Sequence, residues 1–94
     1  MLTRDLSDRA IMLVSLVNRE VCKLPNMAKK VDALLAIANN RSNYFKLAEW
    51  LEIKNYYNQA LASLMEKDPD SAFVRIYKDI TVALNELFKR QFDC

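Results

Sequence analysis

Apolar residues follow helical spacing along most of this chain, and the pattern is clearest between Ser42 and Met65. There they recur in steps of three and four, which places them on one face of an α-helix. The members of this stripe are Trp50, Ile53, Tyr57, Ala60, Leu61 and Leu64. No glycine or proline interrupts the stretch. The pattern therefore predicts a long central helix whose apolar face other segments must cover.

The N-terminal stretch predicts a helix from about Thr3 to Lys23. Thr3 or Ser7 can cap its first turn, and Pro25 ends it because the residue before a proline disfavours the α region. Its apolar positions cover more than half of the circumference. A helix this apolar is predicted to lie at the centre of a bundle or against a second chain.

A second, shorter helix is predicted from Asn26, acting as N-cap, to Ala38. Asn39-Asn40 would end it, because asparagine tolerates the left-handed conformation common at helix C-termini. Ser42 or Asn43 would then start the central helix. In the last stretch, Asp68 as N-cap and Pro69 at the first helical position predict a helix from Pro69 to Gln91.

These elements predict an all-α fold in a single domain spanning residues 1–94. The connections are short, so successive helices are expected to form a compact antiparallel bundle. The bundle has four helices if the central helix is continuous, and five if that helix breaks near Ile53.

Two absences from the composition limit the chemistry. The chain has no histidine and no glycine. Histidine-dependent catalytic triads and glycine-rich phosphate loops are therefore excluded. The carboxylates Glu49 and Glu52 share a helix face, but Lys46 and Lys54 beside them predict ordinary surface ion pairs. We expect no enzymatic activity, no cofactor, no metal and no small-molecule substrate.

Charge and cysteine content give further expectations. The net charge is +2, and residues 23–46 hold five basic side chains against Asp32 alone. The longest apolar run, Ile11 to Val14, is far too short to span a membrane, and the N-terminus carries no secretion signal. Cys22 and Cys94 have no metal-binding spacing and are expected to be reduced thiols, with a disulfide of Cys94, within or between chains, as the alternative. A cytoplasmic protein without a membrane partner is predicted.

The aromatic residues of the central stretch favour protein–protein association. Tyrosine and tryptophan are enriched where binding energy concentrates in interfaces. The central helix and the first helix both carry more apolar surface than a small bundle easily buries. We therefore expect a protein partner or a homo-oligomer, with an interface formed by Trp50, Tyr56, Tyr57, Tyr44 and Met12.

DNA binding is the alternative. Residues 45–62 contain a LAExLxI pattern followed by a second amphipathic segment, which resembles the helix-turn-helix of DNA-binding proteins. This resemblance implies a turn at Glu52, where glycine is usual, and a recognition helix after it. The residues offered to DNA would be Arg41, Lys46, Lys54, Asn55, Asn58 and Gln59. A backbone turn between Leu51 and Asn55 would separate this alternative from one continuous helix.

Overall fold

The computed structural model describes residues 6–40 and 44–92, and these residues form four α-helices without any strand. The helices are α1 (Asp8–Glu20), α2 (Met27–Ala38), α3 (Leu47–Lys67) and α4 (Ala72–Gln91). The all-α fold predicted from the periodicity is therefore confirmed. Within the described ranges, no helix combines the length and the apolar composition that a bilayer crossing requires.

The N-caps of α1 and α2 are the predicted ones. The Ser7 hydroxyl accepts a hydrogen bond from the Ala10 N–H at 3.1 Å, and the Asn26 side chain accepts one from the Lys29 N–H at 2.9 Å. The other candidate cap of the first helix, Thr3, lies outside the described residues. The first helix ends at Glu20, earlier than predicted, because the chain turns before it reaches Pro25.

The end of α2 differs from the prediction. Asn39 follows the helix with φ of −98°, and no residue in the described ranges has a positive φ. Instead of a left-handed cap, the Asn39 side-chain amide donates to the Leu35 carbonyl oxygen at 2.9 Å. Ser42 and Asn43, the predicted start of the central helix, lie outside the described residues. The helix begins at Leu47, where the Glu49 carboxylate accepts from the Lys46 N–H at 2.8 Å.

The start of α4 is also later than predicted. Asp68 does not cap α4, because it follows the last turn of α3 and its N–H donates to the Leu64 carbonyl oxygen at 2.7 Å. The N-cap of α4 is Ser71, whose hydroxyl accepts from the Phe73 N–H at 3.1 Å. Pro69 consequently lies in the α3–α4 loop.

The central helix α3 is continuous from Leu47 to Lys67. The backbone does not turn between Leu51 and Asn55, so the break near Ile53 that would give a fifth helix does not occur. The continuous central helix is therefore confirmed, and the turn that the helix-turn-helix alternative requires within residues 45–62 is absent.

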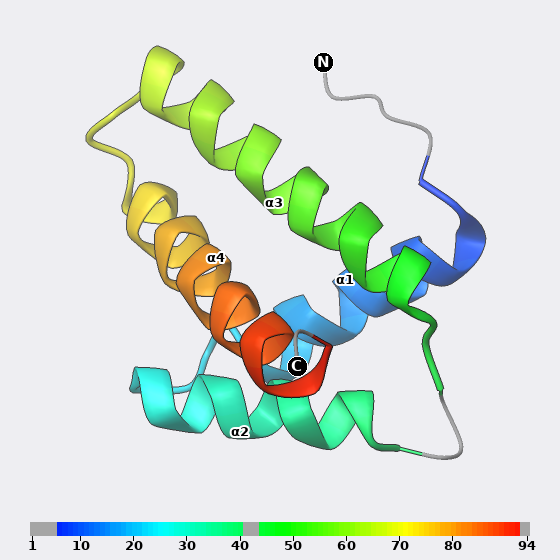
Figure 1. Ribbon diagram of the computed structural model, residues 1–94. Coiled ribbons are helices and arrows are strands. Elements are labelled where there is room, and N and C mark those ends of the chain that lie inside the picture. Colours follow the sequence, from blue (N-terminus) through cyan, green and yellow to red (C-terminus); the bar gives the residue numbers. More distant parts are fainter. Residues whose placement is uncertain (1–5, 41–43, 93–94) are drawn as a thin grey trace.

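The helices α1 and α2 pack against the pair formed by α3 and α4 (Figure 1). α4 contacts α3 and α2, whereas α1 packs against α3. α3 and α4 run in opposite directions as a helical hairpin joined by a short loop. The whole unit is compact, measuring 38 × 30 × 25 Å.

Within the α3–α4 hairpin, the residues that belong to the hydrophobic core lie in one half only. The buried residues of α3 are Trp50, Ile53 and Tyr57, all in its first half, and those of α4 begin at Ile80. None of the residues from 58 to 79 is buried. Figure 1 shows the reason: this part of the hairpin extends beyond α1 and α2.

Candidate functional site

The part of the hairpin without buried residues is the strongest candidate for a binding surface. We call residues 58–79 the distal hairpin. Its apolar side chains continue the stripes that form the core, and we call them the distal face. The distal face consists of Leu61, Leu64, Met65, Phe73, Ile76 and Tyr77. All six are half-buried or exposed; the exposed fraction of Phe73 is 57% and that of Met65 is 47%.

Helix length explains why this face is uncovered. α3 has 21 residues and α1 has 13, so α3 is longer by about 12 Å at 1.5 Å per residue. α1 also crosses α3 obliquely, since Ser7 contacts Glu52 and Asn18 contacts Tyr57, and it ends before it reaches the distal hairpin. The sequence did not predict this difference in length between α1 and α3, because the first helix was expected to span residues 3–23.

Aromatic rings connect the core to the distal face. The ring centroids of Phe73 and Tyr77 lie 6.2 Å apart, and Tyr77 lies 6.0 Å from the buried Tyr57. Tyr56 packs edge-on against Tyr57 at 5.3 Å. Such contacts hold large side chains in place while leaving one side exposed. The distal face is therefore in contact with the aromatic residues of the core through Tyr77.

At this base, polar groups are held in their neutral forms. The Tyr57 hydroxyl donates to the Asn18 side-chain oxygen at 2.7 Å, and the Cys22 thiol contacts the same oxygen at 3.7 Å. Burial raises the pKa of Tyr57 and of Tyr77. Burial also raises the pKa of Cys22, and this effect is opposed by the nearby ammonium of Lys30. The phenols and the thiol thus add no charge beside the apolar face.

Two of the predicted interface residues belong to the core. Trp50 and Tyr57 are fully buried. The Trp50 indole N–H is also enclosed and has no hydrogen-bond partner in the described part of the chain. The sequence pattern placed both residues on the stripe of the central helix but could not show that the chain itself covers them. In this structure neither side chain is available to a partner.

The other predicted interface residues are more accessible. Tyr56 is half-buried, whereas Met12 and Tyr44 are exposed. Arg9 brings Met12 and Tyr44 to one surface, because its guanidinium contacts the Met12 sulfur at 4.0 Å and donates to the Tyr44 carbonyl oxygen. The same guanidinium stacks 4.6 Å from the centre of the Phe45 ring. This surface is a second apolar patch, separate from the distal face.

Four of the residues that the DNA-binding alternative names lie on the continuous helix α3, and no separate recognition helix follows a turn within it. Arg41 lies outside the described residues, and Lys46 precedes the first turn of α3. The Lys54 ammonium lies 4.8 Å from the centre of the Phe88 ring on α4. Asn55, Asn58 and Gln59 are exposed. α3 carries three acidic and two basic side chains, so it lacks the excess of positive charge that phosphate binding requires.

Glu49 and Glu52 have structural roles that differ from the predicted ion pairs. Glu49 accepts from the backbone N–H of Lys46. Glu52 accepts from the Ser7 N–H at 3.0 Å and from the Ser7 hydroxyl at 3.2 Å. Its negative charge thus lies at the N-terminus of α1, where the helix dipole favours it. No cluster of three potential metal ligands occurs within the residues that the structure describes.

A groove of about 240 Å³ lies between α2 and α4. Apolar Val31 and Val82 form part of its lining, with Asp32, Glu86 and Arg90 beside them. Glu86 and Arg90 form an ion pair of 3.0 Å with each other. The groove is therefore lined mainly by apolar surface, and two of its charged lining residues neutralise each other within the chain.

Comparisons with protein-family models, with curated proteins and with solved structures gave no match for this chain.

Proposed function

We propose that this protein is a non-enzymatic protein-interaction module that binds its partner through the distal face. The observation that carries the proposal is the uneven core. The apolar stripes of α3 and α4 continue through residues 58–79, yet none of these residues is buried. A contiguous apolar face of this kind is characteristic of a surface that another macromolecule covers.

The side chains of the distal face suit this role. Phenylalanine, tyrosine and methionine are enriched in the centres of protein interfaces, where water is excluded. Phe73, Tyr77 and Met65 supply all three types. Helical segments that add to this hairpin would complete the antiparallel bundle that the sequence predicts.

The proposal is tested by separating binding from stability. The double variant Met65→Ser/Phe73→Ser removes the two most exposed apolar side chains of the distal face. Surface substitutions usually change stability by less than about 0.5 kcal/mol, so this variant should fold normally. Met12→Ser/Tyr44→Ser is the matched control, because it removes a comparably exposed apolar pair elsewhere.

The tagged chain is used to capture binding proteins from an extract of the source cells. Untagged copies of the same chain count as binding proteins in this experiment. The proposal predicts that the wild type and the control variant retain the same protein and that the distal-face variant loses it. Equal retention by all three chains, or loss from the control alone, would contradict the proposal.

A further inference from the structure

The two ends of the distal hairpin lie beside opposite charges. Residues 66–70, which we call the acidic tip, contain Glu66, Asp68 and Asp70 against Lys67 alone. Residues 21–30, which we call the basic turn, contain Lys23, Lys29 and Lys30 and no acidic residue. The net charge is therefore −2 at the tip and +3 at the turn.

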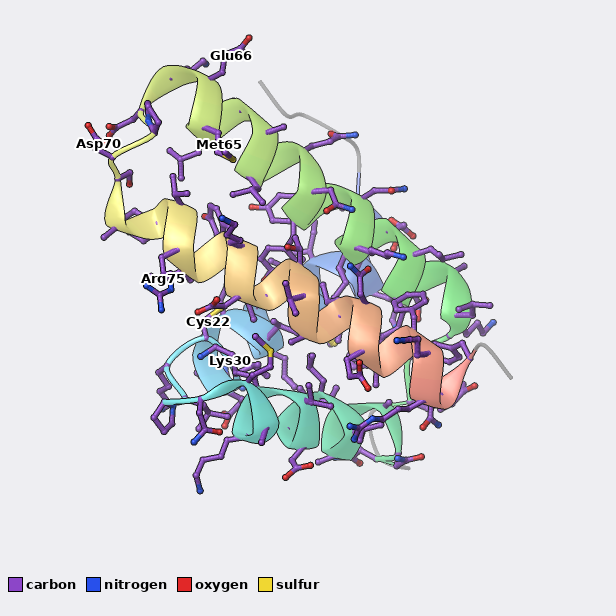
Figure 2. All side chains as sticks on the ribbon, turned by 60° about the vertical axis from the view of Figure 1, so that its left-hand side comes forward. Cys22, Lys30, Met65, Glu66, Asp70 and Arg75 are labelled. Atoms are coloured by element: carbon purple, nitrogen blue, oxygen red, sulfur yellow. The ribbon has the colours of Figure 1, made fainter. Side chains whose placement is uncertain are left out.

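The basic turn lies at the base of the distal hairpin. The Cys22 thiol, within this turn, contacts the same Asn18 side-chain oxygen that accepts the hydrogen bond from Tyr57. Figure 2 shows Cys22 and Lys30 beneath the N-terminal half of α4, and Glu66 and Asp70 at the loop that joins α3 to α4. The distal hairpin therefore has the basic turn near its base, the acidic tip at its loop and the distal face between them.

The exposure of these charges makes them available for contact. Lys23, Lys29, Glu66 and Asp70 are all exposed. Lys30 differs because it is buried and its ammonium donates to the Leu24 carbonyl oxygen within the turn. Lys23 and Lys29 are therefore the members of the turn that can meet a partner's carboxylates.

We propose that the partner of the distal face is a second copy of this chain. The two distal hairpins pack face to face and in opposite directions about a two-fold axis, so the acidic tip of each copy meets the basic turn of the other. This inference rests on the proposed function and names its partner.

Two-fold symmetry is what connects the charge pattern to self-association. In a two-fold interface, if one residue contacts a second residue of the partner, that second residue contacts the first across the axis. When such a face packs against an inverted copy of itself, each end contacts the other end of the partner. The two ends of one face must therefore be complementary to each other. The acidic tip and the basic turn meet this requirement, and the apolar middle would be buried between four helical segments.

Charge exchange provides the test. Lys23→Glu/Lys29→Glu makes both ends of the face acidic, and Glu66→Lys/Asp70→Lys makes both ends basic. Because all four positions are exposed, each variant should fold, which far-ultraviolet circular dichroism and thermal unfolding will verify. Lys46→Glu/Lys89→Glu is the matched control for the first variant, since it makes the same change in net charge at exposed positions outside the distal hairpin and the basic turn.

Sedimentation equilibrium of the full chain at low ionic strength gives the readout. The proposal predicts a dimer for the wild type and the control, and dimerisation weakened about tenfold or more in each charge variant, because like charges then face each other. An equimolar mixture of the two variants should form a heterodimer, because each acidic end then meets a basic one. If neither variant dimerises alone but the two associate when mixed, the acidic tip of one copy contacts the basic turn of the other.

Other results would overturn the proposal. Wild-type dimerisation in both charge variants, or a mixture that stays monomeric, would show that tip and turn do not meet. A monomeric wild type would exclude the second copy. In that case the capture experiment decides the proposed function. If the wild type captures a foreign protein that the Met65→Ser/Phe73→Ser variant does not capture, the proposed function stands. If both chains capture the same proteins, the proposed function is rejected as well.

Discussion

The Tyr57 hydroxyl on α3 donates a 2.7 Å hydrogen bond to the Asn18 side-chain oxygen on α1. This bond joins the last buried residue of α3 to the C-terminal half of the helix that covers it. Beyond it, α3 continues without buried residues. The Tyr57–Asn18 pair therefore marks the boundary between the core and the distal hairpin.

Replacing Tyr57 with phenylalanine removes this bond while keeping the ring. We expect the free energy of unfolding to fall by about 1 kcal/mol, the usual net value of one hydrogen bond. Urea denaturation monitored by circular dichroism measures the change. Tyr44→Phe is the control, because Tyr44 is exposed and its replacement should have no effect. Equal stability of Tyr57→Phe and wild type would show that the bond contributes nothing.

The same side chain predicts a dependence of stability on alkaline pH. Burial, reinforced by Cys22, raises the pKa of Tyr57 above its ordinary value of 10.0. Above that pH the unfolded chain loses the phenolic proton while the folded chain keeps it, so the unfolded state binds fewer protons and is favoured. The contribution of Tyr57 is fully present below pH 10 and is lost progressively above it.

The free energy of unfolding should therefore decrease more steeply above pH 10 in the wild type than in Tyr57→Phe. Urea titrations across this pH range provide the comparison. Tyr77, whose pKa burial also raises, accounts for part of the slope that remains. Parallel curves for the two proteins would be inconsistent with a buried, neutral Tyr57.

The start of α4 gives a prediction that separates the structure from the sequence pattern. Ser71→Ala removes the hydroxyl that caps the Phe73 N–H and should destabilise the protein by about 1 kcal/mol. Asp68→Ala should cost only a few tenths of that amount, because Asp68 follows α3 and does not cap α4. Thermal or urea unfolding ranks the two variants. A larger loss from Asp68→Ala would move the start of α4 back to Pro69.

The uneven core can be tested with two leucines of the same hairpin. Leu84 is fully buried, so Leu84→Ala should cost about 2–5 kcal/mol. Leu64 is half-buried on the distal face, and Leu64→Ala should cost less than half as much in dilute solution. Urea denaturation at low protein concentration measures both. Similar losses would mean that the core extends along the whole hairpin.

Sequence periodicity identified the four helices and the N-caps Ser7 and Asn26, because these features depend on neighbouring residues. The predicted start of α4 at Asp68-Pro69 was wrong, because Ser71 provides an equally acceptable cap and Asp68 follows the last turn of α3. The hydrogen bond between Ser7 and Glu52 joins residues 45 positions apart, and no local sequence pattern predicts it.

The candidate site shows a different limit of the sequence. Trp50 and Tyr57 belong to the same stripe as Leu61 and Leu64, and aromatic residues are as typical of cores as of interfaces. What separates the buried half of the stripe from the exposed half is where α1 ends. That end point depends on the turn before Pro25 and on the packing of α1 against α3, which the spacing of apolar residues does not specify.

Hydrogen exchange of backbone amides at low and high protein concentration tests the central claim most directly. In dilute solution, amides of residues 58–79 should exchange faster than those of the buried segment from Ile80 to Leu87, because few apolar contacts stabilise them. At high concentration the account predicts that protection rises across residues 58–79 and in the basic turn. Protection that is already maximal there in dilute solution, or that rises instead around Met12 and Tyr44, would contradict it.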